Sequence, residues 1–214
     1  MKNNLKEILN ILKWPILFWI GQFLILLIVE FFYSFFADVN NFNNFINKNS
    51  YILSILYLII ILPILKKYYK EENKINYNTC LKVILLAFIL SLTFNILIVL
   101  IKIYLNIKMV FNPNVYILIN TIIIGPILEE YLFRGIVFNK FKNIVNEDKA
   151  CLFTSIIFGL IHLNIISIIY TFIMGFIMNK IYIKYKSITY SICFHITINF
   201  VASLIIPIVV NMSI

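Results

Sequence analysis

Few ionisable residues lie inside the apolar stretches of this chain, and they define the chemistry that it could do. They are Glu30, Glu129, Glu130, Arg134, His162 and His195; Arg134 is the only arginine and the two histidines are the only histidines. A charge inside a bilayer costs about 2.5–3.5 kcal/mol on insertion scales, so a charge that is retained there usually has a function. Carboxylates and imidazoles together can activate water for hydrolysis or relay protons.

Helical spacing in the segment EEYLFR at 129–134 indicates different roles for its two glutamates. Glu130 and Arg134 are four residues apart, so on a helix they lie one turn apart in the favourable order. A guanidinium can hold a carboxylate through two parallel hydrogen bonds. Glu129 is rotated by about 100° from Glu130 and cannot point at the same place. We therefore predict that Arg134 holds Glu130, while Glu129 is left to act as a general base.

Two further pairs have helical spacing. Phe158 and His162 are four residues apart, as are His195 and Asn199, so each pair shares one helical face. By contrast, Glu30 lies on a helix away from these motifs, and we interpret it as a structural or snorkelling residue.

The elements that hold these residues follow from the composition. The chain has 214 residues, of which 62% are hydrophobic and 13% charged, against about 45–50% and about 25% in soluble domains. So much apolar side chain requires a lipid-facing surface, where only helices and closed barrels satisfy the backbone. The apolar runs are continuous rather than alternating, which excludes barrel strands. We predict an all-α, polytopic transmembrane helical bundle that forms a single integral membrane domain over residues 1–214.

The number of helices is expected to be about seven, within a range of six to eight. The apolar runs are Trp14–Phe36, Tyr51–Leu65, Val83–Ile101, a run from Val115 through Glu130, Ala150–His162, Ile165–Ile181 and Ser187–Val210. The second and fifth runs are shorter than the roughly 17–25 residues that cross a bilayer.

The lysines predict the topology of this bundle. With a cytoplasmic N-terminus, fourteen lysines fall on the cytoplasmic side and three on the outer side, as the positive-inside rule requires. The net charge of +9 is therefore attributed to interface anchors rather than to a nucleic-acid surface. The abundance of Asn, Ile and Lys indicates an A- and T-rich genome, so we expect the cytoplasmic membrane of a bacterium.

This topology also predicts a shared site. At about 1.5 Å per helical residue, His162 lies roughly 20 Å from Lys149, and His195 lies roughly 12 Å from Ser187. Glu129 lies roughly 21 Å below Val115, on a helix that descends to the cytoplasm. All three side chains fall in the middle or cytoplasmic half of the bilayer, which supports one common site.

The three motifs together resemble a known family. EEYLFR at 129–134, FGLIH at 158–162 and HITIN at 195–199 are similar to the motifs EExxxR, FxxxH and HxxxN of the CPBP family. This is the CAAX-protease and bacteriocin-processing family of intramembrane endopeptidases, also called Abi. The resemblance covers about residues 115–200, the expected catalytic core. The N-terminal half resembles the family only as generic membrane helices.

The resemblance implies that a peptide bond of a membrane-associated protein or peptide is hydrolysed by activated water. By this resemblance, Glu129 and His162 would activate the water, while His195 and Asn199 would stabilise the oxyanion. Glu130, Arg134 and Phe158 would support the site. The family is often described as metalloproteases, and Glu129, His162 and His195 would suit Zn²⁺ with one open position. A metal-free glutamate base with an oxyanion hole is equally workable.

Two other classes of function are compatible with the sequence. A membrane immunity or binding protein could keep the site and sequester a peptide without cleaving it. A small transporter subunit could use Glu129 and the histidines to relay protons. Transporters often contain related halves, and no internal repeat is visible here, which makes the transporter the weaker alternative.

Overall fold

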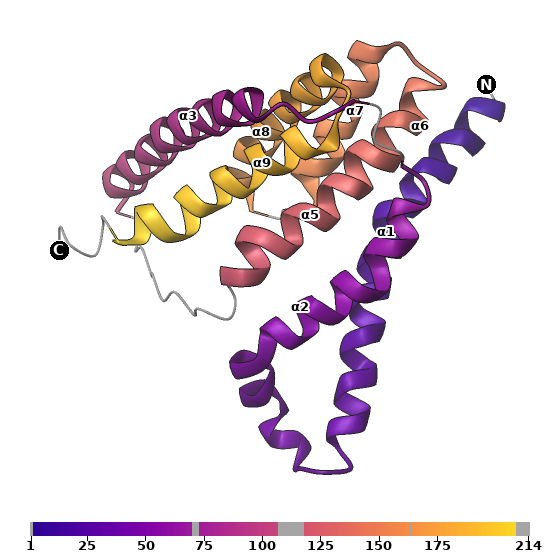
Figure 1. The fold of residues 1–214 in the computed structure, drawn as a ribbon. Coiled ribbons are helices and arrows are strands. Elements are labelled where there is room, and N and C mark those ends of the chain that lie inside the picture. The colour runs from indigo at the N-terminus through magenta and orange to yellow at the C-terminus, as the bar shows by residue number, and fades with distance from the viewer. Residues whose placement is uncertain (1, 70–72, 107–117, 163, 209–214) are drawn as a thin grey trace.

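The computed structural model describes residues 2–69, 73–106, 118–162 and 164–208, and in these ranges its regular elements are all helices (Figure 1). The chain runs through α1 (Lys2–Tyr33), a short 3₁₀ turn η1 (Val39–Asn41), α2 (Phe42–Lys66) and α3 (Tyr77–Tyr104). A composite fourth rod follows. The chain then continues through α7 (Glu147–Leu160), α8 (Ile165–Tyr185) and α9 (Ile188–Phe200), which is extended by η4 (Val201–Ile205).

The fourth rod is helical without interruption from Leu118 to Lys142. It consists of η2 (Asn120–Ile124), α5 (Gly125–Glu130), η3 (Tyr131–Phe138) and α6 (Asn139–Lys142), and both η2 and η3 are π-helical. The first π segment ends at Gly125-Pro126. Proline lacks an N–H and its ring collides with the carbonyl four residues earlier. The wider π turn accommodates the proline, and the helix continues to the glutamates.

The predicted all-α, polytopic bundle is confirmed. The described residues form seven helical rods, one for each predicted apolar run. Among the described residues, four helices are long and apolar enough to cross a membrane: Lys6–Tyr33, Tyr77–Tyr104, Ile165–Tyr185 and Ile188–Ile208. The second helix begins earlier than its apolar run, at Phe42, with a kink at Asn49. Val115 and Val210, two predicted run boundaries, lie outside the described residues, and the cytoplasmic N-terminus stays a prediction.

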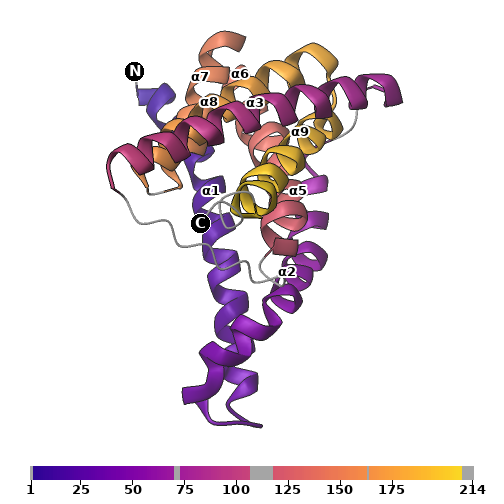
Figure 2. The same ribbon diagram turned by 90° about the vertical axis from the view of Figure 1, so that its left-hand side faces the viewer.

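Figures 1 and 2 show how the rods are arranged. The helices α1 and α2 form a hairpin whose connecting turn projects away from the other helices. The tightest packing joins α7 to α8 and α9 to both α3 and α8. The side chains of Phe133, Phe158, Met174 and Phe194 are at most 1% exposed at the centre of the bundle. Large apolar side chains cover the outside, as expected for a surface in lipid.

Asparagines begin several of these helices. The side chain of Asn76 accepts the N–H of Thr79, and that of Asn146 accepts the N–H of Lys149. Asn164 accepts the N–H groups of both Ile166 and Ser167 at the start of α8. These caps satisfy backbone donors that have no partner within the helix. They fix where α7 and α8 start, and so which residues reach the interior.

Gly159 provides a test of the α7–α8 packing. A Cβ atom at this position would lie 3.0 Å from the Ile168 carbonyl oxygen and 3.1 Å from the Phe172 Cβ. We predict that Gly159→Ala lowers the free energy of unfolding by about 1–3 kcal/mol through overpacking. Gly21 on α1 is the matched control, because a Cβ there meets nothing within 4 Å and alanine favours a helix. Thermal unfolding of the purified protein measures both; equal stability of the two variants would contradict close α7–α8 packing.

Candidate active site

The residues predicted from the sequence surround one cavity of about 200 Å³. Its walls come from the fourth rod, the end of α7, α8 and α9. Glu129, His162, His195 and Asn199 all line it, together with Phe158. Residues that are up to 79 positions apart in the sequence thus meet at one place, as the shared depth of the predicted site residues indicates.

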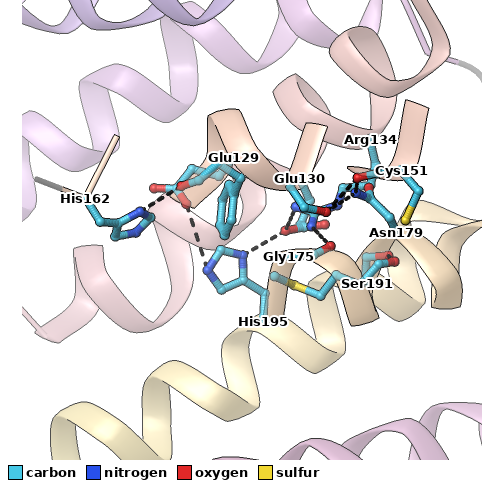
Figure 3. Close-up of polar contacts among 12 residues, drawn as sticks. Glu129, Glu130, Arg134, Cys151, His162, Gly175, Asn179, Ser191 and His195 are labelled. Carbon is cyan, nitrogen blue, oxygen red and sulfur yellow. Dashed lines mark hydrogen bonds and ion pairs between the residues drawn. The ribbon is translucent and has the colours of Figure 1, made fainter. Parts of the chain in front are cut away.

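A buried ion pair lies beside this cavity (Figure 3). Arg134 Nη1 donates to Glu130 Oε1 over 2.7 Å, and both side chains are 0% exposed. The second terminal nitrogen, Nη2, donates to the carbonyl oxygen of Gly175 on α8 over 2.9 Å. The pair expected from the four-residue spacing is therefore formed, and the guanidinium also ties the fourth rod to α8.

His195 extends this pair toward the cavity. Its Nδ1 lies 2.8 Å from Glu130 Oε1, and its side chain is 4% exposed. Because Glu130 is an ionised carboxylate held by Arg134, it accepts, so Nδ1 of His195 carries the proton. The other ring nitrogen, Nε2, then faces Glu129, whose Oε2 is 3.8 Å away. The order of groups is Arg134, Glu130, His195, Glu129.

His162 is held by the end of α7. The helix ends at Leu160, and the N–H of His162 bonds the carbonyl of Gly159. This shorter bond leaves the carbonyl of Phe158 without its usual donor four residues later. The Nδ1 of His162 lies 2.9 Å from that oxygen. A carbonyl can only accept, so Nδ1 is the protonated nitrogen and Nε2 is left with a lone pair for the cavity.

Glu129 differs from Glu130 in its surroundings. Its side chain is 23% exposed where that of Glu130 is 0%. The carboxylate lies between the rings of His162 and His195 (Figure 3), and both histidines act on it electrostatically. Arg134 forms its salt bridge with Glu130 and not with Glu129. One glutamate is therefore locked into the structure and the other faces the cavity.

Asn199 connects α9 to the π turn of the fourth rod. Its Nδ2 donates to the carbonyl oxygen of Thr121 over 2.8 Å. Gly125 bonds Asn120 instead of Thr121, and Pro126 has no N–H, so the Thr121 carbonyl lacks a helical donor. Asn199 fills that gap with one of its two N–H groups and keeps the second. Its expected oxyanion role stays a prediction.

Phe158 is the packing centre of the site. Its ring centroid lies 5.3 Å from that of His162 and 5.7 Å from that of His195. The Arg134 guanidinium lies over the same ring at 5.0 Å. A Cβ at Gly175 would lie 2.9 Å from the Phe158 ring. Sequence reasoning did not single out Gly175, although a glycine in mid-helix often has a packing reason.

The family resemblance allows a zinc ion at Glu129, His162 and His195 but does not require one. Among the described residues, no three His, Cys, Asp or Glu side chains are grouped so that they could hold a metal ion. His162 and His195 each hold a carbonyl or carboxylate through Nδ1, which leaves both Nε2 atoms free, and Nε2 of His195 lies 3.8 Å from Glu129 Oε2. We therefore assign no chemical step to a metal.

Together the fold and the site define a polytopic helical membrane protein with a buried glutamate–histidine centre. Residues 111–201 match the family model described as Type II CAAX prenyl endopeptidase Rce1-like. The chain is also 36% identical over 77 residues to the protein named "Putative membrane peptidase YdiL" from Bacillus subtilis (strain 168). That alignment covers 36% of this chain and 32% of the relative's length. No solved structure matches the chain. Over this region, and with its three motifs in place, the chain is similar to the CAAX-protease and bacteriocin-processing family.

The buried pair can be tested by removing one or both charges. Arg134→Met leaves the buried Glu130 carboxylate without its guanidinium counter-ion, with the His195 hydrogen bond remaining. We expect a loss of about 3–5 kcal/mol in the free energy of unfolding. The double variant Glu130→Gln/Arg134→Met should recover much of this loss, because the glutamine oxygen still accepts from His195 without a buried charge. Denaturant unfolding in detergent measures both variants, with Lys149→Met as an exposed control. A stable Arg134→Met single variant would contradict the pairing.

Proposed function

We propose that this protein is an intramembrane endopeptidase of the CAAX prenyl endopeptidase-like kind, with Glu129 as the base that activates water. The observation that carries the proposal is the division between the two glutamates. Glu130 is held by Arg134 and His195, whereas Glu129 faces the cavity between two histidines. A carboxylate in that position can take a proton from water, as a hydrolase requires.

In the proposed first step, water lies between the Glu129 carboxylate and Nε2 of His162, which accepts a hydrogen bond from it. Glu129 takes one proton, and the oxygen forms a bond to the carbonyl carbon of the peptide. The carbonyl oxygen becomes an oxyanion, stabilised by a protonated His195 and by the remaining N–H of Asn199. In the second step the C–N bond breaks, and Glu129 gives its proton to the leaving amine. The products are a carboxyl terminus and an amine.

The charge balance of the site supports this sequence of steps. With His195 protonated, the cations Arg134 and His195 balance the anions Glu130 and Glu129. When Glu129 becomes neutral, the oxyanion replaces its negative charge, so the net charge of the group stays at zero. A site in a medium of low dielectric favours such a step, because no uncompensated charge is created.

The dimensions of the cavity restrict the substrate. A volume of about 200 Å³ has room for water and the reacting peptide group but not for folded protein. We propose that the substrate is an extended segment of a membrane-associated protein or peptide, and that the protein works in the cytoplasmic membrane of a bacterium. The chain spans about a third of the curated relative's length. The proposed substrate class is therefore inferred from the site and not from that relative.

The test compares membranes from cells that carry the wild-type chain, Glu129→Gln or Glu30→Gln at equal protein levels. Mass spectrometry reports new peptide termini. Termini formed by this protein should decrease by about 10²-fold or more in Glu129→Gln, since glutamine cannot take the proton. Glu30→Gln should match the wild type, because Glu30 does not line the cavity.

One outcome of the same comparison would contradict the endopeptidase proposal. If the biological effect of the wild-type chain persists in Glu129→Gln and no terminus depends on Glu129, the endopeptidase proposal fails.

A further inference from the structure

A second cavity, of about 380 Å³, lies between α3 and α8 and combines apolar walls with three lysines. Ser91 and Phe94 on α3 contact Tyr170 on α8, with the Ser91 and Tyr170 hydroxyl oxygens 3.2 Å apart. Residues near the start of α3 and near the end of α8 line the cavity, so the two helices run antiparallel. We call this cavity the α3–α8 groove.

The charges of the groove are mostly uncompensated. Lys82, Lys180 and Lys184 line it and are exposed. Lys180 pairs with Asp148 over 2.7 Å, but the Lys180 side chain is 46% exposed and that of Asp148 is 85% exposed. Within the described part of the chain, no ion pair involves Lys82 or Lys184. An anion entering the groove would therefore meet an excess of positive charge.

In the predicted topology, the charged and the apolar residues of the groove lie at different depths along the membrane normal. Its three lysines belong to the cytoplasmic side of the predicted topology. Leu86 on α3 lies one turn deeper than Lys82, and Phe176 on α8 lies about 12 Å deeper than Lys184. The cationic end is thus at the expected headgroup level, and the apolar walls are at the level of the acyl chains. This is the order of groups in a phospholipid.

We propose that the α3–α8 groove is a binding site for an anionic phospholipid of the cytoplasmic leaflet. The phosphate would lie among Lys82, Lys180 and Lys184, and an acyl chain would lie along Leu86, Phe176 and Ile177. Basic pockets between membrane helices on the cytoplasmic side bind such headgroups. No residue that lines the groove also lines the cavity around Glu129, so the proposed lipid site is separate from the proposed peptidase site.

Lipid binding to the purified full-length chain in neutral detergent tests the proposal. Native mass spectrometry with phosphatidylglycerol, cardiolipin and phosphatidylcholine gives the affinities. The variant Lys82→Gln/Lys180→Gln/Lys184→Gln should bind the two anionic lipids about tenfold more weakly or worse. The control Lys6→Gln/Lys67→Gln/Lys149→Gln loses the same charge at exposed positions outside the groove and should stay within about twofold of the wild type.

A second variant distinguishes lipid binding inside the groove from attraction to the surface charge alone. Leu86→Trp fills the apolar part while every lysine remains, and it should weaken anionic lipid binding comparably. Inorganic phosphate should not displace the lipid, because it lacks acyl chains. Thermal unfolding without added lipid verifies that each variant is folded. Equal losses in the two lysine variants, no effect of Leu86→Trp, or displacement by inorganic phosphate would each overturn the proposal.

Discussion

The buried chain of Arg134, Glu130 and His195 holds the fourth rod, α8 and α9 together. Charges removed from water are costly unless they are paired and hydrogen-bonded. Arg134 is therefore compensated on two sides, by Glu130 on its own rod and by the Gly175 carbonyl of α8. His195 joins α9 to the same carboxylate. One buried carboxylate and one guanidinium thus set the positions of three helices around the cavity.

Backbone groups that helices leave unpaired fix the remaining site residues. The end of α7 frees the carbonyl of Phe158, and His162 binds it. The π turn before Pro126 frees the carbonyl of Thr121, and Asn199 binds it. In an apolar medium such carbonyls must find donors. The same requirement that stabilises the bundle therefore orients the imidazole and the amide toward the cavity.

The sequence predicts the elements of this protein well, because each apolar run has one physical solution in lipid. The pairing of Glu130 with Arg134 was also predictable, since it needs only helical spacing. The bond from His195 to Glu130 was not, because it joins residues 65 positions apart and depends on how α9 packs. His162 was expected on a helical face, but it lies in the turn just beyond α7. The bond from Arg134 to the Gly175 carbonyl was not predictable either, because a backbone acceptor is not indicated by any residue type.

The most direct test of this account separates stability from turnover at two adjacent residues. Glu129→Gln and Glu130→Gln would each be purified and compared with the wild type for thermal unfolding and for cleavage of a wild-type substrate identified from its new termini. We expect Glu129→Gln to unfold like the wild type but not to cleave. We expect Glu130→Gln to unfold at a lower temperature, because Arg134 loses its counter-ion. A stable, inactive Glu130→Gln together with an active Glu129→Gln would contradict it.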